Sequence, residues 1–138
     1  MLIKIGDREY EAEFNGYTPV VYSQSFADDI GNGHKRPRDI ADAVSRIAAS
    51  LTEYGVPAIT PLLEILYSCI RTANPKWRQG FKDWAAEIPG SAFSLESGDG
   101  WATGVMQIVE RNFFPSAAAA VGAKGAKDAA PAAAAESA

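Results

Sequence analysis

Residues 60–72 read TPLLEILYSCIRT and are apolar almost all the way round a helix. The opening Thr-Pro pair is typical of a helix start, because proline at the first helical position lacks an N–H that would have no partner there. Only Glu64, Ser68 and Arg71 form a narrow polar stripe. A helix that is apolar on nearly every side must be covered by other elements, so we expect residues 61–72 to lie at the centre of the fold.

Four further helices are predicted around this segment. Residues 39–54 carry apolar side chains at three- and four-residue steps, which is the period of an amphipathic helix. A second Thr-Pro pair predicts a helix over residues 18–30, Asn-Pro predicts one over residues 75–88, and residues 100–113 form the last. The side chains expected to face the core are Val20, Val21, Phe26, Ile30, Ile40, Val44, Ile47, Leu51, Tyr54, Trp101, Val105, Ile108, Val109 and Phe113.

The first residues predict a β-hairpin. Residues 2–5 are a short apolar run, and Gly6-Asp7 supplies turn residues that tolerate positive φ. In residues 9–14, Tyr, Ala and Phe alternate with three glutamates, which is the pattern of a strand with one face exposed to solvent. Two strands alone are marginal in water, so this hairpin must rest on the helices.

The last 23 residues, 116–138, include 13 alanines and no large apolar side chain. Such a segment has too little to bury to offset the entropy of ordering it, so we expect a disordered tail. The predicted domains are therefore a helical body over residues 1–115 and a tail over residues 116–138. The fold class follows as α+β, mainly α, with an N-terminal β-hairpin, about five helices and a disordered Ala-rich tail.

The net charge of −4 comes entirely from the body, because the charges of residues 116–138 sum to zero. An acidic body disfavours broad nucleic-acid binding, which depends on clustered Lys and Arg, and gives no reason to expect a membrane partner. The basic stretch 34–38 is the exception, and it keeps open a small nucleic-acid-binding regulator that uses Lys35, Arg36 and Arg38.

Few residues offer chemistry. His34 and Cys69 are the only histidine and cysteine, and one of each cannot build a zinc site. We interpret His34 as a solvated loop residue and Cys69 as a small buried side chain. The acids Asp28-Asp29 could hold a divalent cation with other acids, although a solvated helix end explains them as well. We therefore expect no enzyme activity, no catalytic residue, no metal and no cofactor.

Trp77, Phe81 and Trp84 stand at i, i+4 and i+7, so in a continuous helix they would share one face. One interpretation is packing against the central helix. The other is an aromatic groove that receives an apolar segment of a partner protein, since large aromatic side chains dominate such sites. The cations that give this region a positive edge are Arg71, Lys76, Arg78 and Lys82.

The order of these segments resembles the tail assembly chaperones of long-tailed phages of Gram-positive bacteria. The hairpin IKIGDREYEAEF (residues 3–14) is followed by VVYSQSFADDI (20–30), in which a Tyr and a Phe precede an Asp-Ile pair. The apolar helix LLEILY (62–67), the turn Asn-Pro (74–75) and the segment FKDW (81–84) complete the similarity. It covers residues 1–88.

The resemblance implies a protein that binds the long tape measure protein and recruits tail tube subunits, with no role for nucleic acid or a membrane. Many copies along one rod would supply avidity, and self-association along the rod is expected. The chain would act in the cytoplasm of the infected host and be absent from the mature virion. Ala27 departs from the family's usual Gly. The alternative is a virion structural protein, such as a head–tail connector or minor tail protein.

Overall fold

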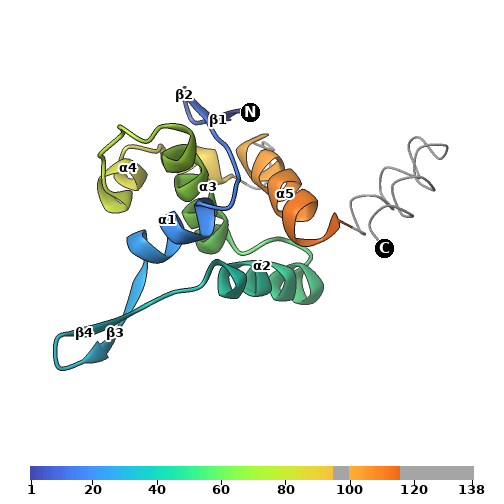
Figure 1. The fold of residues 1–138 in the computed structure, drawn as a ribbon. Helices are drawn as coiled ribbons and strands as arrows, with labels where there is room; N and C mark the ends of the chain where they lie inside the picture. Colours follow the sequence, from blue (N-terminus) through green and yellow to red (C-terminus); the bar gives the residue numbers. More distant parts are fainter. Residues whose placement is uncertain (95–99, 116–138) are drawn as a thin grey trace. The chain divides into compact units, whose positions relative to one another are not determined.

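The computed structural model describes residues 1–94 and 100–115. Its contacts divide the chain into two units, with the boundary between Val105 and Met106. The described elements are β1 (Leu2–Ile5), β2 (Arg8–Glu11), α1 (Thr18–Ser25), β3 (Ala27–Gly31), β4 (His34–Pro37), α2 (Ile40–Tyr54), α3 (Ile59–Ala73), α4 (Phe81–Ala86), the 3₁₀ helix η1 (Gly90–Phe93) and α5 (Gly100–Phe113) (Figure 1).

The expected class is confirmed, because the described residues form an α+β fold, mainly α, with an N-terminal hairpin and five α-helices. The tail expected over residues 116–138 lies outside the described residues, and the predicted domain boundary beside it stays a prediction. No helix in the described part of the chain is long and apolar enough to cross a membrane.

α3 is the central helix of the first unit, as expected. Every residue from Pro61 to Ile70 is buried, and α1 and α2 both pack against this helix (Figure 1). The burial includes Glu64 and Ser68, so two of the three residues of the narrow polar stripe lie inside the protein, whereas Arg71 is half-buried. The Ser68 hydroxyl donates to the Glu64 carbonyl oxygen at 3.0 Å, which satisfies it within the helix.

The N-terminal hairpin is antiparallel, with Leu2 opposite Glu11 and Ile5 opposite Arg8. Ile3 and Ile5 are buried, so one face of β1 rests on the helical core. The turn requires Gly6, which has a φ of +61° and would place an added Cβ 2.7 Å from the Pro89 side chain. A positive φ and this close approach both favour glycine.

The helix predicted over residues 18–30 is wrong beyond Ser25. α1 ends there, and Ala27–Gly31 and His34–Pro37 form a second antiparallel hairpin that extends away from the helices (Figure 1). Ile30 is 59% exposed and Val20 is 45% exposed, so neither faces the core as expected. The Gly31-Asn32-Gly33 stretch makes the hairpin turn, with positive φ at all three residues.

α2 runs over the expected residues and has a cap at each end. The Asp39 carboxylate accepts a hydrogen bond from the Ala41 N–H at 2.9 Å, and Gly55 ends the helix with a φ of +78°. Its apolar stripe is buried only in part. The expected core positions Leu51 and Tyr54 are 36% and 71% exposed, because the stripe continues past the part of α2 that other elements cover.

The helix expected to open at Asn74-Pro75 is much shorter than predicted. α4 spans only Phe81–Ala86, and Gly80 is its N-cap residue rather than an interior residue. The 3₁₀ helix η1 follows α4, and the Trp101 indole N–H donates to the Ala92 carbonyl oxygen at 2.9 Å. Buried side chains in α5 are Trp101, Val105, Ile108 and Val109, whereas Phe113 is partly exposed.

Candidate functional site

The three predicted partner-binding aromatics lie together around Tyr67 of α3. The Tyr67 ring is 5.3 Å from Trp77, 5.5 Å from Phe81 and 5.6 Å from Trp84, between ring centroids. The prediction that they share one helical face is wrong, because Trp77 precedes α4 and lies outside any helix. The three aromatic side chains lie together because each of them contacts the Tyr67 ring of α3.

Burial separates the three aromatics into two kinds. Trp84 has no exposed surface, and it also contacts the Tyr10 ring of the N-terminal hairpin at 6.0 Å. Trp77 and Phe81 are half-buried. Trp84 therefore packs in the core, and Trp77 and Phe81 are the two whose exposed parts another molecule could contact.

Four cations lie in or beside the segment that carries this aromatic cluster. The Arg71 guanidinium lies 5.9 Å from the Tyr67 ring centroid, and its Nη1 donates to the Tyr67 hydroxyl at 3.1 Å. The other three, Lys76, Arg78 and Lys82, are exposed. Within residues 1–94 and 100–115, no carboxylate lies within ion-pair distance of any of the four.

A second polar group is the buried carboxylate of Glu64, which is 4% exposed. It pairs with Arg38 Nη2 at 3.0 Å and lies 3.8 Å from Arg46 Nη2. The Tyr22 hydroxyl donates to it at 3.0 Å. Burial, together with the charge of Glu64, raises the pKa of Tyr22 well above its ordinary value. This arrangement joins α1, the end of the β3–β4 hairpin, α2 and the central helix through one carboxylate.

In the β3–β4 hairpin, acidic side chains on β3 lie opposite basic side chains on β4. Asp28 stands opposite Arg36 and Asp29 opposite Lys35, and Asp28 lies 3.9 Å from Arg36 and 3.5 Å from Arg38. The acids considered as a cation site therefore lie beside basic side chains. In the described residues, no group of three or more His, Cys, Asp or Glu side chains could hold a metal ion.

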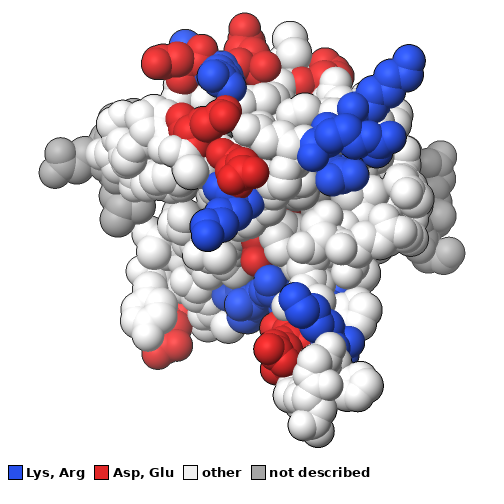
Figure 2. Space-filling view, turned by 90° about the vertical axis from the view of Figure 1, so that its left-hand side faces the viewer, with Lys and Arg blue, Asp and Glu red and all other residues white. Residues whose placement is uncertain are grey.

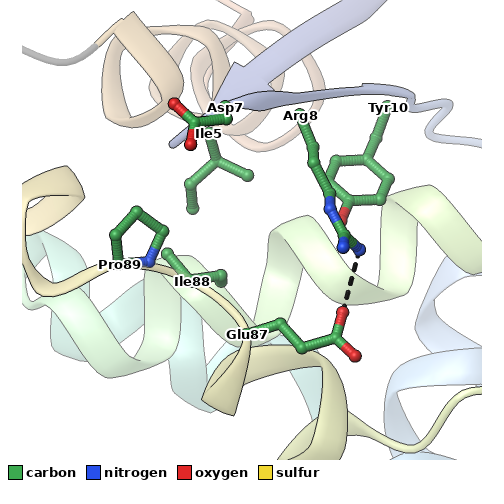
Figure 3. A pocket seen from close by; sticks show the side chains of 7 residues that line it. All are labelled: Ile5, Asp7, Arg8, Tyr10, Glu87, Ile88 and Pro89. Carbon is green, nitrogen blue, oxygen red and sulfur yellow. Dashed lines mark hydrogen bonds and ion pairs between the residues drawn. The ribbon is translucent and has the colours of Figure 1, made fainter.

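A small pocket lies between the N-terminal hairpin and the segment after α4. It has a volume of about 160 Å³ and is lined by Ile5, Asp7, Arg8, Tyr10, Glu87, Ile88 and Pro89 (Figure 3). Arg8 Nη1 pairs with the Glu87 carboxylate at 2.9 Å across it. A hydrogen bond with Tyr10 and the charge of Glu87 raise the pKa of Arg8. The pocket is thus lined by an ion pair and by apolar side chains. It has room for a few water molecules or a small polar group.

Apolar side chains are also exposed in two other places. A shallow groove of about 380 Å³ is lined by Pro19, Val20, Ser23, Gln24, Pro37 and Asp39. The second place is the C-terminal end of α2, where Leu51 and Tyr54 are followed by Val56, which is 40% exposed. Leu51 and Tyr54 are three residues apart, so they lie on the same side of α2.

His34 and Cys69 lie in different surroundings. His34 is exposed on β4 of the hairpin rather than in a loop. Cys69 is fully buried in α3, and burial raises the pKa of its thiol from 9.0 to about 12. The thiolate is therefore suppressed in the folded protein, which does not favour a nucleophilic role.

The buried thiol predicts that the protein loses stability in alkaline solution. The folded state holds the Cys69 proton up to about pH 12, whereas the unfolded chain releases it above about pH 9. The contribution of Cys69 to the free energy of unfolding should therefore hold below pH 9 and fall between pH 9 and pH 12, with a slope approaching about 1.4 kcal/mol per pH unit. Tyr22, whose pKa is also raised, adds a loss of the same sign above about pH 10. Urea unfolding at a series of pH values measures this slope. Cys69→Ala should reduce the slope, and an unchanged slope would contradict the assignment.

Sequence reasoning missed the Glu64 site and the β3–β4 hairpin. A glutamate inside an otherwise apolar helix is a signal for a buried carboxylate, because such a charge needs a cation beside it. Nothing in the sequence identified Arg38 as that cation, since it lies 26 residues away.

Comparison with known proteins adds no relative. The chain matches no model of a protein family, and no curated protein and no solved structure is significantly similar to it.

Proposed function

We propose that this protein is a tail assembly chaperone of a long-tailed phage, which covers the tape measure protein and recruits tail tube subunits during assembly. The sequence resemblance over residues 1–88 suggests the role. The structure is compatible with it in part, since a hairpin, a short helix, a central apolar helix and the Phe-x-x-Trp segment follow one another in that order, whereas Ala27–Gly31 form strand β3 where a helix is predicted.

The observation that carries the proposal is the uncovered end of the α2 stripe. Ile40, Val44 and Ile47 of this stripe are buried, but Leu51 and Tyr54 continue the same face into solvent. An apolar helix face that extends beyond the core into solvent is suited to bind an apolar helix of another protein. A long helical protein that exposes such faces before assembly would aggregate unless a partner covered them.

The proposal predicts that a co-expressed tape measure protein stays soluble only in the presence of this chain. The double substitution Leu51→Glu and Tyr54→Glu should abolish the effect, because two charges would replace the apolar face. A matched control is Leu2→Glu, which alters a side chain that is 63% exposed on β1, away from α2. The soluble fraction of the tape measure protein is the measurement, and equal solubility with and without the chain would contradict the proposal.

Mass spectrometry of purified particles separates this function from the alternative of a virion structural protein. A chaperone is expected to be missing from the mature virion, whereas a connector or minor tail protein would be present in a fixed number of copies.

A further inference from the structure

We propose that the surface formed by Trp77, Phe81 and the cations Arg71, Lys76, Arg78 and Lys82 binds an acidic helical segment of a partner protein. We call it the cationic aromatic surface. It is distinct from the uncovered end of α2, and its test does not depend on the proposed phage role.

The aromatic part of this surface is held in place from beneath. Tyr67 contacts both Trp77 and Phe81, and the buried Trp84 ring lies 6.2 Å and 6.1 Å from them. The Tyr67 hydroxyl donates to the Gln79 carbonyl oxygen at 2.6 Å, which ties the segment between α3 and α4 to the central helix. Aromatic side chains that are fixed before binding lose little entropy when a partner packs on them.

Within residues 1–94 and 100–115, no carboxylate neutralises the charge of this surface. Residues 71–83 contain four cations and one acid, Asp83, so they carry +3, and the rest of the chain carries −7 to give the total of −4. Elsewhere, Arg8, Arg36 and Arg38 each lie within ion-pair distance of a carboxylate. The four cations of this surface lack such a partner in the described residues, which leaves them available to carboxylates of another molecule.

Figure 2 shows a cluster of basic side chains on the side of the molecule that carries the connection between α3 and α4. The connection between α3 and α4 lies at the left of Figure 1, and Figure 2 views the molecule from that side. On the upper right of Figure 2, Lys and Arg side chains gather with no acidic side chain among them.

An acidic peptide fits this surface better than a nucleic acid does. The Trp77 ring is tilted by 42° to Tyr10 and by 52° to Tyr67, so these rings do not form a flat platform on which successive bases could stack. A duplex also carries one negative charge at every ~1.7 Å of its axis, many more charges than four cations can neutralise. The negatively charged remainder of the chain would repel it. A short helix with glutamates and leucines presents charge and apolar contact within the same small area.

The test uses a synthetic helical peptide of about 16 residues, with leucine at every third or fourth position and glutamate between them. Binding is measured by anisotropy of the labelled peptide, and we expect a dissociation constant of about 10–100 μM for the full chain. Substituting Lys76→Glu, Arg78→Glu and Lys82→Glu together should weaken binding by at least about tenfold.

A matched control has the same change in net charge. Lys4→Glu, Lys35→Glu and Arg36→Glu also replace three exposed cations, but on the two hairpins, and should leave the affinity within about twofold. Circular dichroism checks that both triple variants fold. Trp77→Ala should weaken binding without loss of charge, because it removes an apolar contact.

Several results would overturn the proposal. These are no binding by the wild-type chain, equal weakening in both triple variants, equal binding of a peptide with serine in place of leucine, and tighter binding of a single-stranded oligonucleotide of equal charge. The last result would assign the surface to nucleic acid instead.

Discussion

Replacing Glu64 with alanine should lower the free energy of unfolding by about 3 kcal/mol, because it removes the buried partner of an ion pair and leaves Arg38 with only the exposed Asp28, 3.5 Å away. Arg38 would lose the carboxylate that it contacts at 3.0 Å, and the Tyr22 hydroxyl would lose its acceptor. Both groups are largely withdrawn from water, since the Arg38 side chain is 23% exposed and Tyr22 is fully buried. Chemical denaturation with a two-state analysis measures the loss.

Two further variants identify the cause of that loss. Glu53→Ala removes an exposed acid from the preceding helix, α2, and should change stability by no more than about 0.5 kcal/mol. Glu64→Leu combined with Arg38→Met removes both charges, and it should be clearly more stable than Glu64→Ala, because apolar replacements of a buried pair are often tolerated. A loss below about 1 kcal/mol for Glu64→Ala would mean that water, rather than Arg38, solvates the carboxylate in solution.

The elements that sequence reasoning found are those whose apolar side chains repeat with a helical or strand period. α2 and α3 have such repeats over 15 residues each, and the N-terminal hairpin has alternation on either side of Gly6. The β3–β4 hairpin has no apolar repeat. It is made of cross-strand charges, such as Asp28 opposite Arg36, and Val20, Phe26 and Ile30 before its turn can be interpreted as one helical face.

The candidate site was predictable only in its residue types. Trp77, Phe81 and Trp84 do lie together, but the cause is Tyr67, which belongs to the preceding helix. Local spacing cannot show a contact made through a side chain on another element. For the same reason, Arg38 was interpreted as one of several basic loop residues, although it contacts a carboxylate in the central helix.

The aromatic cluster permits one more test, which separates support of the fold from binding. Trp84→Ala should lower the free energy of unfolding by about 3–5 kcal/mol, because it opens a cavity beneath rings that close over a fully buried indole. In the described part of the chain the Trp84 indole nitrogen has no hydrogen-bond partner, so the loss would report packing rather than a broken hydrogen bond.

Trp77→Ala is the matched variant, since it deletes the same side chain at a half-buried position of the same cluster. It should cost only about 1–2 kcal/mol, because less apolar surface is withdrawn from water there. Urea denaturation of both variants measures the difference, and far-UV circular dichroism checks their helix content. Equal losses would mean that Trp77 supports the core as much as Trp84 does. A small loss in stability with a large loss in peptide binding would instead assign Trp77 to a contact outside its own chain, because a side chain that mainly supports the fold cannot be removed at so little cost.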